Sequence, residues 1–225
     1  MTVMIKQSRE LLTRRFDTPD QAFLTRTLSQ PVGSVVAAAA HALRLSPNAV
    51  TSLGLVVMLA AAGAYAWCDG IAGAILAAVL FQLGFAFDCA DGQLARATKR
   101  QSPFGAWLDV TCDHIRQGCI CLALTVVVPS VVGYLCAALL LAGLSVYLHT
   151  VMSIKVTAAP PMSLSGNANR LRFALKEWLD TPVFLLMLCL LREWPGLLLA
   201  YVASYGLLSL ARAASLAKLR LARAT

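Results

Sequence analysis

Long apolar segments alternate with short polar breaks over most of this chain. Each break carries turn-forming residues, for example at 68–70 and 194–196. A helix needs about 20 apolar residues to cross a bilayer, and the segment 180–192 reaches that length only if its helix begins near Leu175. The pattern predicts an all-α integral membrane protein with six transmembrane helices, at about 47–67, 71–97, 104–128, 131–156, 180–192 and 195–219.

The first 44 residues follow a different pattern. Residues 1–18 are polar and basic, and we expect a cytoplasmic lead-in. Residues 19–44 mix apolar and polar positions, which predicts an amphipathic interfacial helix with a break at Pro31. Ser46 suits an N-cap, so residues 45–225 form the predicted six-helix transmembrane domain.

Composition and charge agree with a membrane protein. Of the 225 residues, 59% are hydrophobic and 13% are charged, against about 25% charged in soluble domains. The net charge of +8 does not indicate nucleic-acid binding, because no soluble basic face is present. The basic residues gather at one set of helix ends, whereas the opposite turns hold only Arg192. By the positive-inside rule, both termini are cytoplasmic in a multi-pass protein of the cell (inner) membrane.

Four aspartates stand out among these apolar segments. Acidic side chains at membrane depth are costly, so they indicate a functional site. Asp88 and Asp91 share one face of the second predicted span, and Asp109 and Asp113 share one face of the third. Spans joined by a short loop are neighbours, so the four carboxylates converge at the cytoplasmic mouth.

Four neighbouring carboxylates repel one another unless cations balance them. Oxygen ligands suit Mg²⁺ or Mn²⁺ rather than zinc. Two divalent cations match the four negative charges, and such pairs commonly assist displacement at phosphorus. We therefore expect Asp88, Asp91, Asp109 and Asp113 to bind two divalent cations, Mg²⁺ or Mn²⁺.

The residues between the aspartates complete a pattern. Gly92, Ala95 and Gly105 leave the helix faces bare, and Arg96 is suited to a bidentate phosphate contact. Asp-x-x-Asp-Gly-x-x-Ala-Arg, eight residues, then Gly-x-x-x-Asp-x-x-x-Asp resembles the signature of the CDP-alcohol phosphotransferase (phosphatidyltransferase) family. The start of the first span, Pro47-Asn48-x-x-Thr51, is also similar to that family.

The resemblance implies a function. Members displace CMP from a CDP-linked donor, such as CDP-diacylglycerol or another CDP-alcohol, with an acceptor alcohol in phospholipid or related polar-lipid biosynthesis. It implies that Asp113 is both metal ligand and general base, and that members are homodimers in the lipid bilayer. The nucleotide site implied by the family comprises Asp88, Asp91, Gly92, Ala95, Arg96, Gly105 and Thr51.

The acceptor alcohol is less sharply indicated. The stretch 102–109 resembles the branches of the family that use inositol phosphate or another polyol phosphate. Arg116 is a charge within a span, one turn beyond Asp113, and we expect it to partner a carboxylate or a phosphate. We expect Arg116, with Lys155, Arg170 and Arg172 at the same mouth, to bind an anionic acceptor; flanking charge facing anionic lipid is the alternative for the last three.

Two other classes stay open from the residues alone. A magnesium-dependent membrane prenyltransferase also uses aspartates and a diphosphate, but it has two separate aspartate motifs. A divalent-cation transporter needs acidic residues along a path through several helices. In this chain the aspartates lie on two helices at one mouth.

Overall fold

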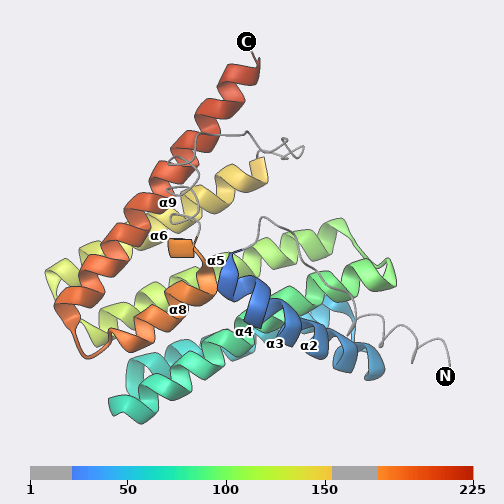
Figure 1. The fold of residues 1–225 in the computed structure, drawn as a ribbon, viewed down its shortest axis with the longest axis horizontal. Helices are drawn as coiled ribbons and strands as arrows, with labels where there is room; N and C mark the ends of the chain where they lie inside the picture. The colour runs from blue at the N-terminus through green and yellow to red at the C-terminus, as the bar shows by residue number, and fades with distance from the viewer. Residues whose placement is uncertain (1–21, 154–176, 225) are drawn as a thin grey trace.

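The computed structural model describes residues 22–153 and 177–224, with side chains up to Lys218. These residues form helices and turns, with no strand among them (Figure 1). The predicted lead-in at 1–18 lies outside the described residues. The helices are η1 (Thr25–Ser29), α2 (Gln30–Ala42), α3 (Pro47–Trp67), α4 (Gly70–Thr98), α5 (Pro103–Val127), α6 (Val131–Ser153), α8 (Thr181–Leu190) and α9 (Pro195–Ala224).

Five described helices, α3, α4, α5, α6 and α9, are long and apolar enough to cross a membrane. The predicted fifth span, at 180–192, is not confirmed, because α8 has only 10 residues. A helix of this length covers about 15 Å, half of the hydrocarbon thickness. The helix begins at Thr181 because the backbone of Asp180 is extended, with φ −70° and ψ 122°, and Pro182 is suited to the first turn, where its missing N–H needs no partner.

The chain is helical from Phe23 to Ala42, so the predicted break at Pro31 is wrong. One wide turn precedes the proline: the N–H of Gln30 bonds to the carbonyl of Thr25, in the π-helical pattern. Because Pro31 has no N–H, a local change of pitch accommodates it without ending the helix. The helix packs against α4 through small residues, including Ala37, which is fully buried.

The remaining helices pack as neighbours around one apolar core. α3 contacts α4 and α5, α6 contacts α9, and α8 lies against α4. At one end of the bundle Arg192 forms an ion pair of 3.0 Å with Asp69, so the turn after α8 lies beside the turn between α3 and α4. Since α8 is short, it reaches this end of the bundle but begins part of the way across it. Near its start lies a cavity between α5, α6 and α9.

Candidate active site at the junction of α4 and α5

The α4–α5 connection brings the aspartates of both helices to the same end of the bundle. α4 ends at Thr98, and the backbone of the following residue, Lys99, is left-handed with φ 56°. α5 begins three residues after Arg100, and Ser102 caps it by accepting a hydrogen bond of 3.0 Å from the N–H of Gly105. A connection this short holds the last turns of α4 beside the first turns of α5.

Three of the four aspartates form an acidic cluster. One carboxylate oxygen each from Asp88, Asp109 and Asp113 lies within 4.8 Å of the others, and all three residues are partly buried. Carboxylate oxygens this close repel one another without a positive partner. The donor set and its spacing fit a hard divalent cation.

Asp91 lies beside this cluster and is held separately. Its side chain is buried, and its Oδ2 accepts a hydrogen bond of 2.5 Å from the hydroxyl of Thr51 on α3. Asp91 shares a small cavity with Asp88 and a larger one with Asp109. The carboxylate of Asp91, on α4, therefore faces the same region, and its hydrogen bond to Thr51 of α3 fixes its orientation.

Arg116 supplies a positive charge to the acidic cluster. Its guanidinium donates to Asp88 at 3.1 Å and also to Asp113, and its side chain is only 14% exposed. The expectation that this intramembrane charge partners a carboxylate is confirmed. A buried guanidinium paired with two carboxylates offsets part of their repulsion.

A cavity of about 220 Å³ opens beside the cluster, between the starts of α3 and α5 and the end of α4. It brings together five residues expected to bind the nucleotide: Thr51, Asp91, Gly92, Ala95 and Gly105. Asp109 also lines it. The sequence did not single out Arg100, Gln101 and Ser102 as lining residues, because they lie in the connection where helical periodicity ends.

Two glycines line this cavity at positions where an added side chain would contact neighbouring polar groups. A Cβ at Gly92 would lie 3.1 Å from Nη1 of Arg96, so the guanidinium of Arg96 lies over the bare backbone of Gly92, which lines the cavity. A Cβ at Gly105 would lie 3.1 Å from Oδ1 of Asn48, at the contact between α5 and α3. Larger residues at either position would displace polar groups beside the cavity.

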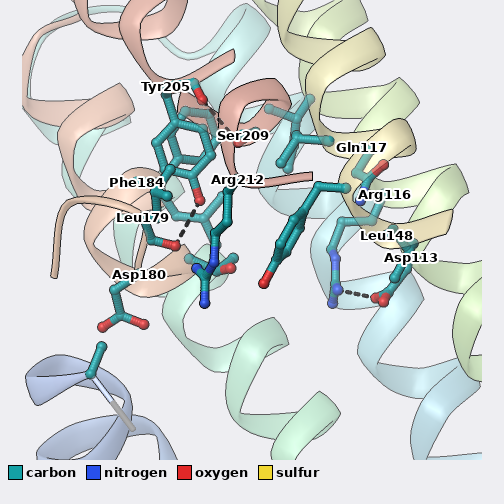
Figure 2. Close-up of a pocket in the computed structure, with 16 residues that line it drawn as sticks. Asp113, Arg116, Gln117, Leu148, Leu179, Asp180, Phe184, Tyr205, Ser209 and Arg212 are labelled. Atoms are coloured by element: carbon teal, nitrogen blue, oxygen red, sulfur yellow. Dashed lines mark hydrogen bonds and ion pairs between the residues drawn. The ribbon is translucent and has the colours of Figure 1, made fainter. Parts of the chain in front are cut away.

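A second, larger cavity of about 300 Å³ reaches the acidic cluster at Asp113 (Figure 2). Asp113 and Arg116 line one side of it, and Asp180 stands at the opposite side with Arg212 between them. The guanidinium of Arg212 lies over the ring of Tyr147, 5.0 Å from its centroid. Two arginines in one partly polar cavity suit an anionic ligand.

The sequence missed Arg212 as a site residue, because a basic residue near the end of an apolar helix is typical of a cytoplasmic flank. No spacing connects it to the aspartates, which lie about a hundred positions earlier. Lys155, Arg170 and Arg172, expected at the same mouth, lie outside the described residues.

The fold and the site define a multi-pass membrane protein with an acidic centre between two cavities. The sequence profile of the CDP-alcohol phosphatidyltransferase family matches residues 44–211, so this chain belongs to that family, whose members transfer substituted phosphate groups. The family match confirms the resemblance drawn from the aspartate signature.

Two relatives are similar over part of the chain. An archaetidylinositol phosphate synthase of Pyrococcus horikoshii is 35% identical over 78 residues, which are 35% of this chain and 39% of that protein. A phosphatidylinositol phosphate synthase of Corynebacterium glutamicum is 36% identical over 89 residues, which are 37% of this chain and 36% of that protein. Each match spans less than half of the relative's length.

Proposed function

We propose that this protein transfers a substituted phosphoryl group from a CDP-linked donor to a hydroxyl of a polyol phosphate, such as inositol phosphate, and releases CMP. The donor is CDP-diacylglycerol or another CDP-alcohol. One observation carries the proposal: Asp113 belongs to the acidic cluster and also lines the cavity that holds Arg116 and Arg212. The family match and the activities for which the two relatives are named support it.

In this proposal the two cavities hold the two substrates. The CDP group occupies the cavity lined by Thr51, Gly92 and Gly105. The acceptor occupies the larger cavity, with its phosphate on Arg116 and Arg212. Lys155, Arg170 and Arg172 remain proposed further contacts to the acceptor. The polyol hydroxyls find hydrogen-bonding partners in the side chains of Gln117, Tyr147 and Ser209, which line the same cavity.

The reaction needs a base, a leaving group and charge neutralisation. Two divalent cations, Mg²⁺ or Mn²⁺, bound by Asp88, Asp91, Asp109 and Asp113 would neutralise the diphosphate and the departing CMP. Asp113 accepts the proton of the acceptor hydroxyl while the oxygen of that hydroxyl bonds to the donor phosphorus. The bond between that phosphorus and the oxygen of CMP breaks, and CMP keeps the electron pair. The helices supply position and a fixed electrostatic environment.

The proposed membrane setting follows the charge pattern. We propose an interfacial helix over 19–44, a transmembrane domain over 45–225, cytoplasmic termini and active site, and an inner-membrane location. The described part of the N-terminal helix supports the first of these, because Phe23, Leu28 and Val35 are exposed next to the exposed Arg26. A homodimer is proposed from the family resemblance.

The test is an assay of CMP release by the purified full-length protein in lipid or detergent. CDP-diacylglycerol is offered with a panel of acceptors: inositol phosphate, glycerol phosphate, free inositol and serine. The proposal predicts metal-dependent CMP release that is fastest with a phosphorylated polyol. CMP release that is equally fast with unphosphorylated acceptors contradicts the assignment of the arginine-lined cavity, and no CMP release with any CDP-alcohol contradicts the reaction class.

A further inference from the structure

The start of the N-terminal helix is capped by carboxylates from a distant part of the chain. The N–H of Phe23 donates to Oε2 of Glu177 at 2.8 Å, and the N–H of Thr25 donates to Oδ2 of Asp180 at 3.1 Å. The hydroxyl of Thr25 donates to Oδ1 of Asp180 at 2.5 Å. The first N–H groups of a helix have no partner within that helix, and negative charge is favourable near them. Glu177 and Asp180, more than 150 positions away, supply both the hydrogen-bond acceptors and the negative charge.

Asp180 serves this distant helix rather than its own. It precedes α8 at the N-cap position, where an aspartate commonly accepts from the N–H groups of the following turn. Here its side chain makes no such hydrogen bond. Both carboxylate oxygens instead accept from Thr25, and the residue is only 7% exposed. A buried carboxylate aimed at another element fixes the position of that element.

The segment around Asp180 is itself fixed to the bundle. The hydroxyl of Tyr205 on α9 donates to the carbonyl of Leu179 at 3.1 Å, and Nε2 of Gln82 on α4 donates to the carbonyl of Pro182 at 2.8 Å. Asp180 therefore connects the N-terminal helix to two spanning helices through a short, well-anchored segment.

The same contact borders the larger cavity. Ala22, immediately before the N-terminal helix, lines that cavity together with Asp180 and Thr181, whereas Thr25 does not line it. Figure 2 shows Asp180 at the cavity edge, directed toward the N-terminal helix, on the side opposite to Asp113. The position of the helix start thus determines where one wall of the cavity lies.

We propose that Asp180 is a positioning residue for the acceptor: by holding Thr25 it keeps the start of the N-terminal helix as a wall of the acceptor cavity and thereby limits the size of the acceptor. The role of this cavity rests on the proposed function. Asp180 acts through Thr25, so loss of the Thr25 hydroxyl and loss of the Asp180 carboxylate should change acceptor binding in the same direction, the second by at least as much.

The test compares purified full-length variants by separate donor and acceptor KM values. Thr25→Val removes the hydroxyl donor and leaves a residue of similar shape, and we expect the KM for inositol phosphate to rise about tenfold, as for loss of one hydrogen bond to a charged group. The KM for the CDP donor should change by less than about twofold, because neither Thr25 nor Asp180 lines the nucleotide cavity. Thr25→Ser keeps the hydroxyl and preserves the acceptor KM.

Asp180→Ala gives at least the same rise in acceptor KM, and adding Thr25→Val to it gives no further rise. Both Thr25→Val and Asp180→Ala also turn over a bulkier polyol phosphate faster, relative to inositol phosphate, than the unaltered protein does. The matched control is Asp69→Ala: Asp69 also precedes a helix and pairs with another segment, through Arg192, but it lies away from the cavity. This control leaves the acceptor KM unchanged.

Hydrogen exchange gives a readout that does not depend on activity. The proposal predicts faster amide exchange over residues 22–26 in Asp180→Ala than in Asp69→Ala, because the N–H of Thr25 loses its acceptor. Unchanged exchange overturns the proposal. So does a rise in acceptor KM in Asp180→Ala without one in Thr25→Val, because Asp180 would then act by direct contact. If the unaltered protein releases no CMP, the proposed function fails, while the exchange measurement still decides whether Asp180 holds the helix.

Discussion

Thr51 and Asp91 lie 40 positions apart in the sequence, and the hydroxyl of Thr51 donates a hydrogen bond of 2.5 Å to the carboxylate of Asp91. The contact joins α3 to α4 inside the bundle, where both side chains are buried. It orients a carboxylate that faces Asp88 in one cavity and Asp109 in another. A residue outside the aspartate signature thus helps to position one of its members.

Thr51→Val should weaken metal use without unfolding the protein. The valine has a similar shape but leaves Oδ2 of Asp91 without its donor. Loss of a partner that orients a metal ligand typically costs about 10- to 100-fold in metal affinity or activity. A titration of CMP release with Mg²⁺ or Mn²⁺ should show a higher requirement for metal, and Thr51→Ser should resemble the unaltered protein. An unchanged titration in Thr51→Val would show that this hydrogen bond does not matter for the metal site.

Asp113→Asn should slow the chemical step more than it weakens donor binding. A general base contributes about 10²- to 10⁴-fold to a rate, and the asparagine amide cannot accept the proton. Single-turnover CMP release measures the chemical step, and equilibrium binding of the CDP donor measures affinity. Lost donor affinity with intact single-turnover chemistry would assign Asp113 to binding alone.

Asp109→Asn should abolish CMP release. Asp109 belongs to the acidic cluster and lines the nucleotide-side cavity, so it is placed to bind metal next to the diphosphate. Chelation of divalent cations should have the same effect on the unaltered protein. Near-normal release by a well-folded Asp109→Asn protein, or in the presence of chelator, would exclude the metal mechanism.

The two arginines of the larger cavity should give different kinetic signatures. Arg212 contacts Tyr147 and lines that cavity without a described ion pair to the acidic cluster, so Arg212→Ala should raise the acceptor KM about 10- to 100-fold and leave the metal requirement unchanged. Arg116 also pairs with Asp88 and Asp113, so Arg116→Ala should change both quantities. Lys218→Ala, at an exposed position on the same helix as Arg212, is the control. Equal effects of Arg212→Ala and Lys218→Ala would indicate general loss of positive charge.

The predicted topology can be tested at two exposed positions of the described chain. In a cysteine-free variant, Gln101→Cys in the α4–α5 connection should resist a membrane-impermeant thiol reagent added to intact cells. Glu193→Cys, in the turn between α8 and α9, should react. The reason is the excess of basic residues at the end that contains Arg96, Lys99 and Arg100. The opposite labelling pattern would reverse the orientation.

The sequence predicted the elements whose signals are local. Five spans follow from runs of apolar residues, and the approach of Asp88, Asp109 and Asp113 follows from helical spacing and a short connection. Ser46, expected as an N-cap, caps α3 by accepting a hydrogen bond from the N–H of Ala49.

The features that the sequence did not predict depend on contacts between distant segments. The apolar segment 180–192 was expected to span the membrane with an earlier start, but the extended backbone of Asp180 makes α8 begin at Thr181 and leaves it 10 residues long. Pro31 was expected to break its helix, yet a wide turn accommodates it. Arg212 and Asp180 gain their surroundings from packing against other helices. No pattern along the chain pairs Asp180 with Thr25, because each is an ordinary polar residue in its own segment.

The most direct test of the proposed reaction is the identity of the lipid product. The unaltered protein is incubated with CDP-diacylglycerol, Mg²⁺ or Mn²⁺, and inositol phosphate carrying a labelled phosphate, and the lipid fraction and CMP are quantified together. We expect a labelled lipid that forms in a one-to-one ratio with CMP and is absent with Asp109→Asn. Release of CMP without labelled lipid, or labelled lipid formed equally well by Asp109→Asn, would contradict the proposed reaction.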